Sequence, residues 1–382
     1  MSEAIKQLAV RTALALGAGT VRITSARADE ESRRRMQGAF ARGDFLCWSY
    51  DDEYARRATD PSELCGGARS VVCIAFPYST AAPRAGPLRG RVSNYAWSAD
   101  YHRRLRALLD SVAHTIDEAA GKRVTTVACD TRPLAERALA ARAGLGWIGK
   151  HTNLISPGLG SFVFLGEVVT TLELPPDESI AKSCGSCARC VDACPTGALR
   201  GDYTIDANRC ISDLTQRTDA IPPAMRPLIG DWVWGCDICQ QVCPPTRDAG
   251  HRGGAQWAPA NPEAACPGLV DLLRLRSSAF KKRFRHTAMG WRGAAVLRRN
   301  AAVALGNALD RSTVGPLVES LCGDPHPMVR GHAAWALGRI GSPDAVAALR
   351  GQSNVERSLE VRAEISMALQ PFGPSPRVCS TR

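Results

Sequence analysis

The chain of 382 residues has no apolar run of about 20 residues, the length that crosses a bilayer as a helix, so we expect no membrane span. Lys6 and Arg11 lie beside a short Ala/Leu stretch, but neither a small-residue cleavage site nor a twin-arginine signal accompanies it. These absences predict a cytoplasmic protein. The composition, 45% hydrophobic and 22% charged, excludes disorder as the main state.

Acidic residues are absent from one long stretch of the C-terminal part. The formal net charge is +11, and residues 251–382 hold 18 Lys/Arg against 9 Asp/Glu, so they carry +9 of it. Between Arg274 and Arg299 there are nine basic residues and no acidic one. Such a basic face usually attracts phosphate groups. A solvated basic surface without a partner is the alternative.

Fifteen cysteines in a chain without an export signal are not expected to form disulfides, because the cytosol keeps thiols reduced. Metal binding or catalysis is the better interpretation. Seven of them are scattered and are expected to be buried, small apolar side chains. These seven are Cys47, Cys65, Cys73, Cys129, Cys266, Cys322 and Cys379.

The other eight cysteines follow the spacing of iron–sulfur proteins. A Cys-x2-Cys-x2-Cys-x3-Cys-Pro run is followed by a Cys-x2-Cys-x3-Cys-Pro run, with one cysteine between them. In proteins with two [4Fe–4S] clusters, the last cysteine before proline binds the other cluster. We therefore assign Cys184, Cys187, Cys190 and Cys243 to one cluster, and Cys194, Cys210, Cys236 and Cys239 to the other. Zinc is the competing interpretation, since CxxC pairs also bind zinc.

The chain divides into three segments by pattern. Residues 1–177 predict an α/β (α+β) domain, with strands at 70–76, 125–129 and 161–172 and helices at 101–119 and 133–143. Residues 178–250 are the ferredoxin-like segment. Residues 251–382 combine a Gly/Ala/Pro-rich linker with Ala-Leu pairs that recur every 32 residues, which is typical of HEAT-like helical repeats. The Gly144–Gly149 motif ends a helix rather than following a strand, so it predicts a turn rather than a dinucleotide site.

Several motifs closely resemble the epoxyqueuosine reductases, over roughly residues 45–345. The matching stretches are 130–137, 142–150, 153–155, 160–167, 210–215, 235–244 and 299–307. The resemblance implies an oxidoreductase that reduces epoxyqueuosine to queuosine at the wobble position of tRNA, the last step of queuosine biosynthesis. It also implies two [4Fe–4S] clusters and a base-off cobalamin. Consistent with base-off binding, the chain has no Asp-x-His-x-x-Gly motif to place a histidine below the cobalt.

The same resemblance implies roles for single residues. Asp130 would protonate the leaving epoxide oxygen, whereas its ordinary interpretation is a helix N-cap ahead of Pro133. The residues expected to line the cobalamin site are Tyr95, Tyr101, His102, Asp130, Lys150, Asn153 and Ser161. The basic residues expected to bind tRNA are Lys281, Lys282, Arg283, Arg285, Arg298 and Arg299. The remaining partner is an external electron donor such as ferredoxin or flavodoxin, and we expect a monomer.

Departures from the family pattern leave other functions open. They are Asp213, Gln216-Arg217, His151, Pro245 and the region around Tyr54–Arg57, which aligns poorly with the family. One alternative is a divergent corrinoid and iron–sulfur reductase, similar to a reductive dehalogenase, acting on another substrate. The missing export signal and the helical repeats argue against it. Another is a non-catalytic electron-transfer protein, which would need no 177-residue domain with a matched acid.

Overall fold

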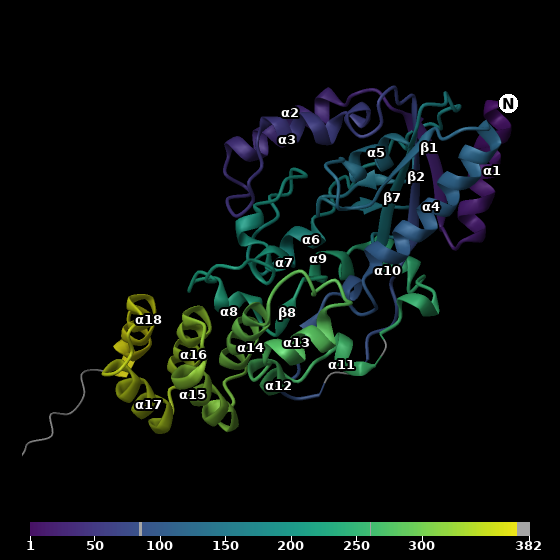
Figure 1. Cartoon of the computed structure of the whole chain (residues 1–382). Helices are drawn as coiled ribbons and strands as arrows, with labels where there is room; N and C mark the ends of the chain where they lie inside the picture. Colours follow the sequence, from purple (N-terminus) through teal and green to yellow (C-terminus); the bar gives the residue numbers. More distant parts are fainter. Residues whose placement is uncertain (84–85, 260, 373–382) are drawn as a thin grey trace, which may run out of the picture. The chain divides into compact units, whose positions relative to one another are not determined.

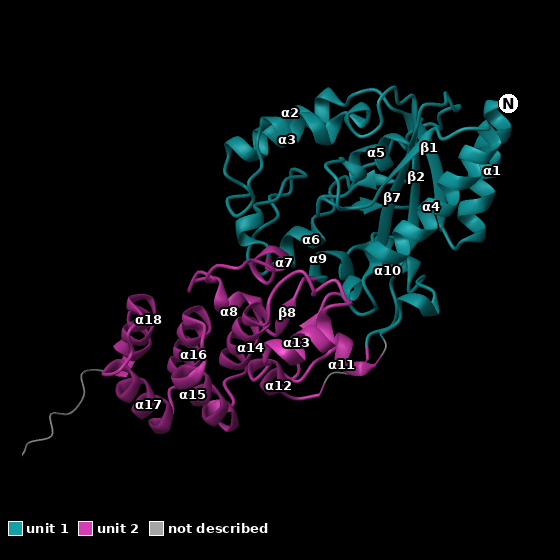
Figure 2. Ribbon diagram, viewed as in Figure 1, with its two compact units in different colours: residues 1–82, 94–210, 237–260 teal, residues 83–93, 211–236, 261–382 magenta. Residues whose placement is uncertain are grey.

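The computed structural model describes residues 1–83, 86–259 and 261–372 and separates into two units (Figures 1 and 2). Unit 1 comprises Met1–Ala82, Asn94–Cys210 and Asp237–Ala260. Unit 2 comprises Pro83–Ser93, Ile211–Cys236 and Asn261–Arg382. Both sequence boundaries, at 177 and 250, fall inside unit 1, so the division into three domains stays a prediction.

The centre of unit 1 is a sheet in the order β1-β2-β7-β4, in which all neighbours are antiparallel (Figure 1). Its strands are β1 (Thr20–Ser25), β2 (Ser70–Pro77), β4 (Thr125–Ala128) and β7 (Val163–Thr170). Helices α1 (Ser2–Ala15) and α4 (Tyr101–Ala120) cover one face, and α5 (Glu136–Arg142) covers the other. Because both faces are buried, β2 is apolar almost throughout rather than alternating. The expected strands and helices are confirmed, although α5 begins three residues later than predicted.

The rest of unit 1 consists of short elements joined by loops. The helices are α2 (Glu30–Ala41), α3 (Asp52–Thr59), α6 (Arg189–Asp192), α9 (Ile238–Gln241), α10 (Pro244–Ala249), η1 (Pro61–Glu63), η2 (Asn94–Ala96), η3 (Ala207–Arg209) and η4 (Ala255–Trp257). A hairpin pairs β5 (Trp147–Ile148) with β6 (Leu154–Ile155). Gly144, with a φ of +85°, forms the turn between α5 and this hairpin, as the sequence predicts.

Unit 2 contains the repeated helices. Helices α14 (Ala294–Ala308), α16 (Pro327–Ile340) and α18 (Leu359–Leu369) pack in sequence, with α15 (Val314–Gly323) and α17 (Pro343–Ser353) between them along the chain. The three Ala-Leu pairs fall on α14, α16 and α18, which confirms the 32-residue repeat. The other elements are β3 (Arg91–Val92), β8 (Trp232–Trp234), α7 (Ile211–Leu214), α8 (Arg226–Ile229), α11 (Pro262–Ala265), α12 (Leu269–Leu273), α13 (Ser277–Phe284), η5 (Arg311–Thr313) and η6 (Gln370–Phe372).

Two arginines of α14 are buried rather than exposed. Arg299 is 0% exposed, and its guanidinium donates to the main-chain carbonyl oxygens of Leu214, Arg217 and Asp219. Arg298 forms an ion pair with Asp324 and donates to a further main-chain carbonyl. The predicted tRNA contacts at Arg298 and Arg299 are therefore wrong, because both side chains are already bound inside their own unit.

The neighbouring Asn300 extends this anchor. Its side-chain amide donates to the carbonyl oxygens of Thr215 and Val233. Together with Arg299 it fixes the 211–236 segment to α14 through five hydrogen bonds to main-chain oxygens. Buried main-chain carbonyls need such donors, so this contact completes the packing of the segment.

Two expectations about the whole chain can be compared with the described residues. In that part of the chain, no helix has both the length and the apolar character needed to cross a membrane. Cys73, Cys129 and Cys266 are buried, as predicted for scattered cysteines, but Cys65 is only partly buried, and Cys47 and Cys322 are exposed. Cys379 lies outside the described residues.

Candidate active site

Asp130 lies in a strained turn just beyond the end of β4. Its φ is +53°, a left-handed conformation that non-glycine residues rarely adopt. Such strained residues cluster at functional sites. Helix α5 begins only at Glu136, with Ala135 at its N-cap position. The N-cap interpretation of Asp130 is therefore wrong, and its carboxylate is directed to other partners.

Those partners are side chains at the start of α4. Asp130 Oδ2 accepts a hydrogen bond from the Tyr101 hydroxyl at 2.5 Å and lies 3.0 Å from His102 Nε2. His102 Nδ1 lies 2.6 Å from Asp100 Oδ1, and Asp100 also caps α4 by accepting the His102 N–H. The Tyr101 ring stacks on Phe164 of β7 with 4.3 Å between centroids. The helix start and the sheet thus hold the phenol, imidazole and carboxylate together.

The electrostatics of this group favour a shared proton. Burial alone lowers the pKa of His102, but its hydrogen bonds to Asp130 and Asp100 outweigh burial and raise that pKa above its ordinary value. The hydrogen bond from His102 is the largest cause that lowers the pKa of Asp130; burial opposes it, and the Tyr101 hydroxyl adds to it. Both shifts favour the ion pair, in which His102 carries the proton and Asp130 is a carboxylate.

Two further acids near Asp130 were not identified from the sequence. The backbone N–H of Asp130 donates to the Glu136 carboxylate, and burial raises the pKa of Glu136 to about 8. Glu167 lies opposite Ala128 in the sheet and is 0% exposed. Neither of its carboxylate oxygens has a hydrogen-bond partner among the described residues, and burial raises its pKa well above the ordinary value. The sequence feature that could have identified Glu167 is its place as an ionisable residue inside an otherwise apolar strand.

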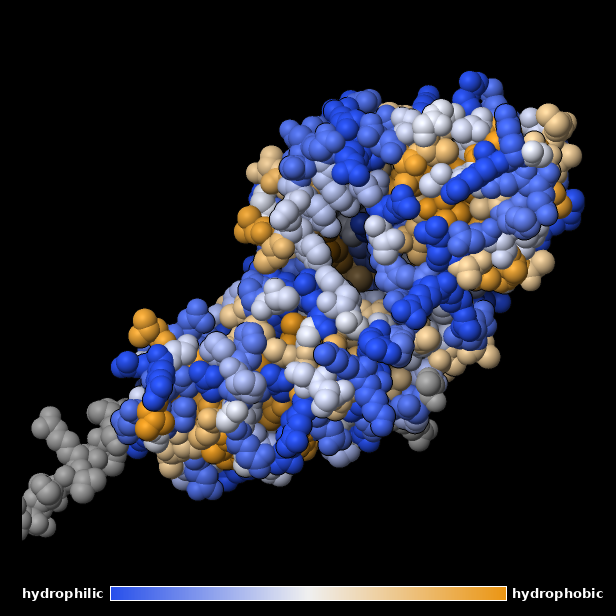
Figure 3. Space-filling view, in the orientation of Figure 1, coloured by the Kyte–Doolittle hydropathy of each residue, from blue (hydrophilic) through white to orange (hydrophobic). Residues whose placement is uncertain are grey.

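A cleft of about 980 Å³ opens beside Asp130 and is lined wholly by unit 1. Its lining comes from residues 29–54, 130–152 and 202–205. Figure 3 shows a hollow in this part of the molecule. Asp130 and Glu136 share the lining with apolar Leu134, Ala138 and Ile148. Cofactor and ligand sites usually measure about 300–1,000 Å³, so this cleft suits a large cofactor.

The residues predicted to line the cobalamin site do not all lie together. The ring of Tyr95 meets that of Tyr101 edge-on at 6.1 Å, so both tyrosines lie together with His102 and Asp130. Lys150 instead donates its ammonium to the carbonyl oxygen of Gly185, in the cysteine-rich segment.

Asn153 and Ser161 make contacts of a different kind. The main-chain N–H of Asn153 donates to His151 Nδ1. Ser161 is 4% exposed and bonds Thr246 of α10 through both its N–H and its hydroxyl. Its predicted cofactor contact is wrong, because burial against α10 leaves no surface for a ligand.

The first set of cysteines is brought together around α10. Cys184 and Cys243 pack with Trp147 and Ile155 in one apolar cluster. Burial is the largest cause that raises the pKa of Cys190 and of Cys243, and the nearby Cys184 thiol adds to both shifts. These groups are therefore close neighbours, as ligands of one cluster must be.

Among the second set of four cysteines, Cys194 has contacts that favour metal binding. The Cys194 sulfur lies 3.5 Å from the Thr196 hydroxyl. Burial raises the pKa of Cys194, but hydrogen bonds from Thr196 and from nearby backbone N–H groups outweigh it and lower the pKa overall. This favours the thiolate, the form that binds metal. Cys236 ends a segment of unit 2 and the other three lie in unit 1, so the division of ligands between clusters stays a prediction.

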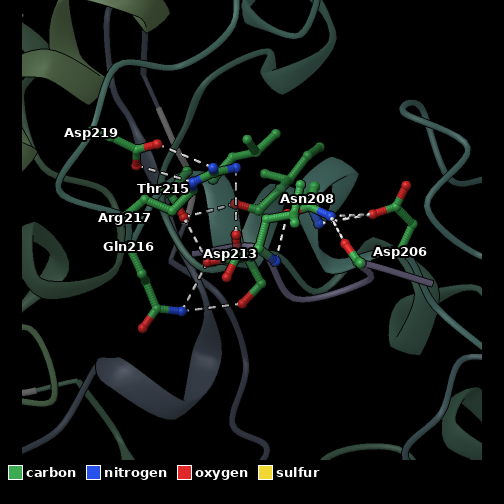
Figure 4. A network of polar contacts seen from close by, with 12 residues as sticks. Asp206, Asn208, Asp213, Thr215, Gln216, Arg217 and Asp219 are labelled. Carbon is green, nitrogen blue, oxygen red and sulfur yellow. Dashed lines mark hydrogen bonds and ion pairs between the residues drawn. The ribbon is translucent and has the colours of Figure 1, made fainter. Parts of the chain in front are cut away.

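The residues that depart from the family pattern have partners or suitable positions within this chain. Figure 4 shows Arg217 between two carboxylates, 3.8 Å from Asp213 and 3.1 Å from Asp219. Two departures, Asp213 and Arg217, thus pair with each other. His151 is buried, which lowers its pKa to about 4 and keeps it neutral. Pro245 lies in the first turn of α10, where proline needs no N–H partner.

Four of the predicted tRNA contacts remain on the surface of unit 2. Lys281, Lys282, Arg283 and Arg285 are exposed, whereas the aromatic residues of α13 face the core. Beyond them, Trp291 is 54% exposed, and the Arg292 guanidinium lies 3.7 Å from its ring centroid. Basic side chains beside an exposed aromatic ring are a combination typical of RNA-binding surfaces.

Comparisons with known proteins agree with this site. Three family models match: "4Fe-4S double cluster binding domain" at residues 183–246, "HEAT repeats" at 293–370, and "Epoxyqueuosine reductase QueG, DUF1730" at 58–131. The epoxyqueuosine reductase of Bacillus anthracis is 34% identical over 96% of this chain and 97% of its own length. The chain belongs to the epoxyqueuosine reductase family. The Escherichia coli member is 38% identical over 72% of this chain and 74% of its own.

Solved structures of the family have the same fold. A selenomethionine-labelled epoxyqueuosine reductase superposes with a TM-score of 0.91 at 33% identity, covering 98% of this chain and all of that one. Another, solved with an epoxyqueuosine-modified tRNA-Tyr stem loop, has a TM-score of 0.89 at 34% identity and covers 97% of this chain and 99% of its own. Family membership confirms the predicted oxidoreductase class, the two [4Fe–4S] clusters and the HEAT-like repeats.

Proposed function

We propose that this chain reduces epoxyqueuosine to queuosine at the wobble position of tRNA, the last step of queuosine biosynthesis. The observation that carries the proposal is the contact between the Asp130 carboxylate and the His102 imidazole, with Asp130 in the wall of a cleft of cofactor size. The double-cluster domain and the relative crystallised with an epoxyqueuosine-modified stem loop support the same reaction.

The residues around Asp130 fit a proton-delivery role. Removing the epoxide oxygen as water requires two electrons and two protons. Cobalamin and the clusters, when bound, supply the electrons. Asp130 gives the leaving oxygen one proton that it takes from His102, and the second proton comes from solvent. Tyr101 orients the carboxylate through its hydroxyl, and Asp100 keeps His102 in place. This arrangement resolves the conflict between a lowered pKa of Asp130 and its role as an acid, since the proton is stored on the neighbouring imidazole.

The cleft fits cobalamin in size and in chemistry. The apolar side chains of its lining suit the faces of a macrocycle, its charged side chains suit polar substituents, and Asp130 lies in its wall. Of the residues predicted to contact the cofactor, Asp130 lies in the lining of this cleft, and Tyr101 and His102 are hydrogen-bonded to it. Tyr95, Lys150 and Asn153 lie outside the lining and stay candidates for contacts with the periphery of the cofactor. A cytoplasmic monomer that receives electrons from a ferredoxin or flavodoxin completes the proposal.

The direct test is reduction of an epoxyqueuosine-containing anticodon stem–loop by the reconstituted holoenzyme under reducing, anaerobic conditions. Mass spectrometry of the nucleosides should show the loss of one oxygen atom and the formation of queuosine. If no queuosine forms and the same enzyme instead dehalogenates an organohalide, the chain is a divergent corrinoid reductase.

A pH profile tests the role of His102. Because the pKa of His102 is raised, the imidazole keeps its proton to a higher pH than free histidine, whose pKa is about 6.5. Turnover should therefore be highest below the raised pKa and fall as the pH rises through it, when the pair loses its transferable proton. The His102→Gln variant should lose this alkaline step. His114→Gln, an exposed residue on the same helix, should keep it. An unchanged profile in His102→Gln would assign the step to another group.

Changing Lys281, Lys282, Arg283 and Arg285 together to alanine tests the exposed basic surface. If these side chains bind phosphate, complex formation releases counterions, and affinity falls steeply with salt. The variant should bind tRNA more weakly and with a flatter salt dependence, while its clusters and cobalamin binding are unchanged. A matched control changes four exposed arginines of the repeats instead: Arg311, Arg339, Arg357 and Arg362. Equal losses in both variants would indicate an effect of net charge rather than a docking surface.

A further inference from the structure

A second cavity, of about 210 Å³, lies at the start of α4 and is lined wholly by unit 1. We call it the arginine pocket, and its lining consists of His102, Arg103, Arg106, Val127, Cys129, Thr131 and Arg132. The Asp130–His102 pair joins the two cavities, because Asp130 lines the larger cleft and His102 lines the arginine pocket. Arg132 lines both. The arginine pocket therefore adjoins the site of proton transfer but is separate from the cleft assigned to the cofactor.

The walls of the arginine pocket follow from the geometry of a helix and a strand. His102, Arg103 and Arg106 belong to the first two turns of α4, the blue helix of Figure 1. Residues three and four positions apart are neighbours on a helix, so Arg106 lies next to both of the others. Val127 and Cys129 are two positions apart at the end of β4, which places them on one face, and each is only 5% exposed. The basic side chains thus surround a buried floor.

The arginine pocket differs from the larger cleft in its charge. The lining of the larger cleft has six carboxylates and five arginines, whereas that of the arginine pocket has three arginines and no carboxylate. The floor adds no negative charge, because burial raises the pKa of the Cys129 thiol and keeps it protonated. A cavity with charge of one sign on its walls attracts ligands of the opposite sign.

Neighbouring carboxylates compensate only part of this positive charge. Arg106 pairs with Asp110 of its own helix, and the charge of His102 is balanced by the carboxylates that hold it in the active site. Arg103 and Arg132 are exposed, and their guanidinium groups have no hydrogen bond or ion pair with any other residue that the structure describes. Two guanidinium groups at one pocket are therefore available to an anion, and their planar shape matches a phosphate group.

The size of the arginine pocket restricts the anion to a small one. A water molecule takes about 30 Å³ in the liquid, so a cavity of about 210 Å³ holds a phosphate group with a few waters and excludes a corrinoid. A nucleoside whose reacting atom meets Asp130 brings the phosphates of its own strand to this side of the acid. The neighbouring acid thus favours a phosphate that belongs to the substrate.

We propose that the arginine pocket binds a phosphate group of the RNA strand beside the wobble nucleotide, with Arg103 and Arg132 as its ligands. The inference rests on the proposed function, because it requires the wobble nucleoside to reach Asp130. It adds to that function a contact that fixes the position of the strand while the epoxide is reduced.

The first test measures binding of a fluorescent anticodon stem–loop to the full-length holoenzyme. Arg103→Gln should weaken binding about tenfold or more, the usual scale for losing a hydrogen bond to a charged group. The slope of log affinity against log salt should fall by about one, because one phosphate contact is lost. Arg103→Lys keeps the charge but not the planar group, so it should keep the salt dependence and only part of the affinity. The matched control is Arg11→Gln, which changes an exposed arginine of α1 that lines neither cavity.

The second test identifies the phosphate. Stem–loops that carry a single neutral methylphosphonate linkage, on one side or the other of the wobble nucleotide, remove one negative charge at a time. One of these probes should bind the wild type as weakly as the normal probe binds Arg103→Gln. The same probe should lose no further affinity with Arg103→Gln or Arg132→Gln, because a contact that is already lost cannot be lost twice.

Three results would overturn the inference. If both glutamine variants bind the normal probe as Arg11→Gln does, the pocket makes no contact with RNA. If every neutral linkage weakens the variants as much as the wild type, the arginines act through net charge alone. If inorganic phosphate protects the pocket of the wild type from heat unfolding but does not compete with the stem–loop, the site binds a free anion. Failure of the proposed function is detected separately, as wild-type protein that binds the stem–loop but forms no queuosine, and the inference then fails with it.

Discussion

Replacing Asp130 with asparagine should lower turnover by about 10²-fold or more, the usual scale for losing a general acid. Asparagine keeps the size of the side chain, and its amide oxygen can still accept the Tyr101 hydrogen bond. It cannot take a proton from His102 and pass it on. Single-turnover assays of stem–loop reduction measure the effect, and the visible spectrum after reconstitution should show cobalamin still bound.

A matched control separates this effect from a general loss of charge. Asp110→Asn removes an exposed carboxylate from α4, where it pairs with Arg106, and should leave turnover unchanged. If Asp130→Asn retains near-normal turnover while cobalamin stays bound, Asp130 is not the donor. His102 would then be the first group to examine, because it holds the proton in this geometry.

Replacing Arg299 with methionine should destabilise unit 2 by about 3 kcal/mol or more, because each buried carbonyl oxygen left without its donor costs about 1–3 kcal/mol. Methionine fills part of the space but leaves the carbonyl oxygens of Leu214, Arg217 and Asp219 without their donors. Urea unfolding followed by circular dichroism measures the change. The clusters are a second readout, because the released 211–236 segment directly precedes Asp237 and Cys239.

Arg276→Met is the control for this variant. Arg276 is exposed, so its loss should change stability by less than about 0.5 kcal/mol. If both variants unfold at the same urea concentration, the Arg299 anchor adds nothing to the stability of unit 2.

Much of the architecture could be predicted from the sequence because its signals were local. Apolar runs predicted β2, β4 and β7, and a 32-residue period predicted the helices of unit 2. The spacing of cysteines predicted two clusters, because short loops between cysteines allow them to bind several iron atoms of one [4Fe–4S] cluster. No local pattern could predict that both units are built from separate segments of the chain. Segments of unit 2 interrupt unit 1 in the sequence, and this arrangement depends on contacts between distant residues.

The site was predicted only in part, for a similar reason. The resemblance identified Asp130, but its left-handed backbone and its link to His102 depend on where α4 begins relative to β4. Arg298 and Arg299 looked like surface charges because charge counting cannot tell which helix face is buried. Ser161 looked accessible because the packing of α10 against it involves residues 85 positions away. Glu136 and Glu167 were in motifs already identified, but their burial could be seen only in three dimensions.

The anchor at Arg299 and Asn300 recognises peptide oxygens, and a peptide oxygen is the same whatever side chain the residue carries. Positions 214, 215, 217 and 219 can therefore change identity without losing a single one of these bonds, whereas the two donors cannot. Mutational tolerance should be asymmetric across this contact: a library randomised at 217 and 219 should yield many folded proteins, and one randomised at 299 and 300 very few. The unusual Asp213–Arg217 pair is the kind of drift that such a contact permits.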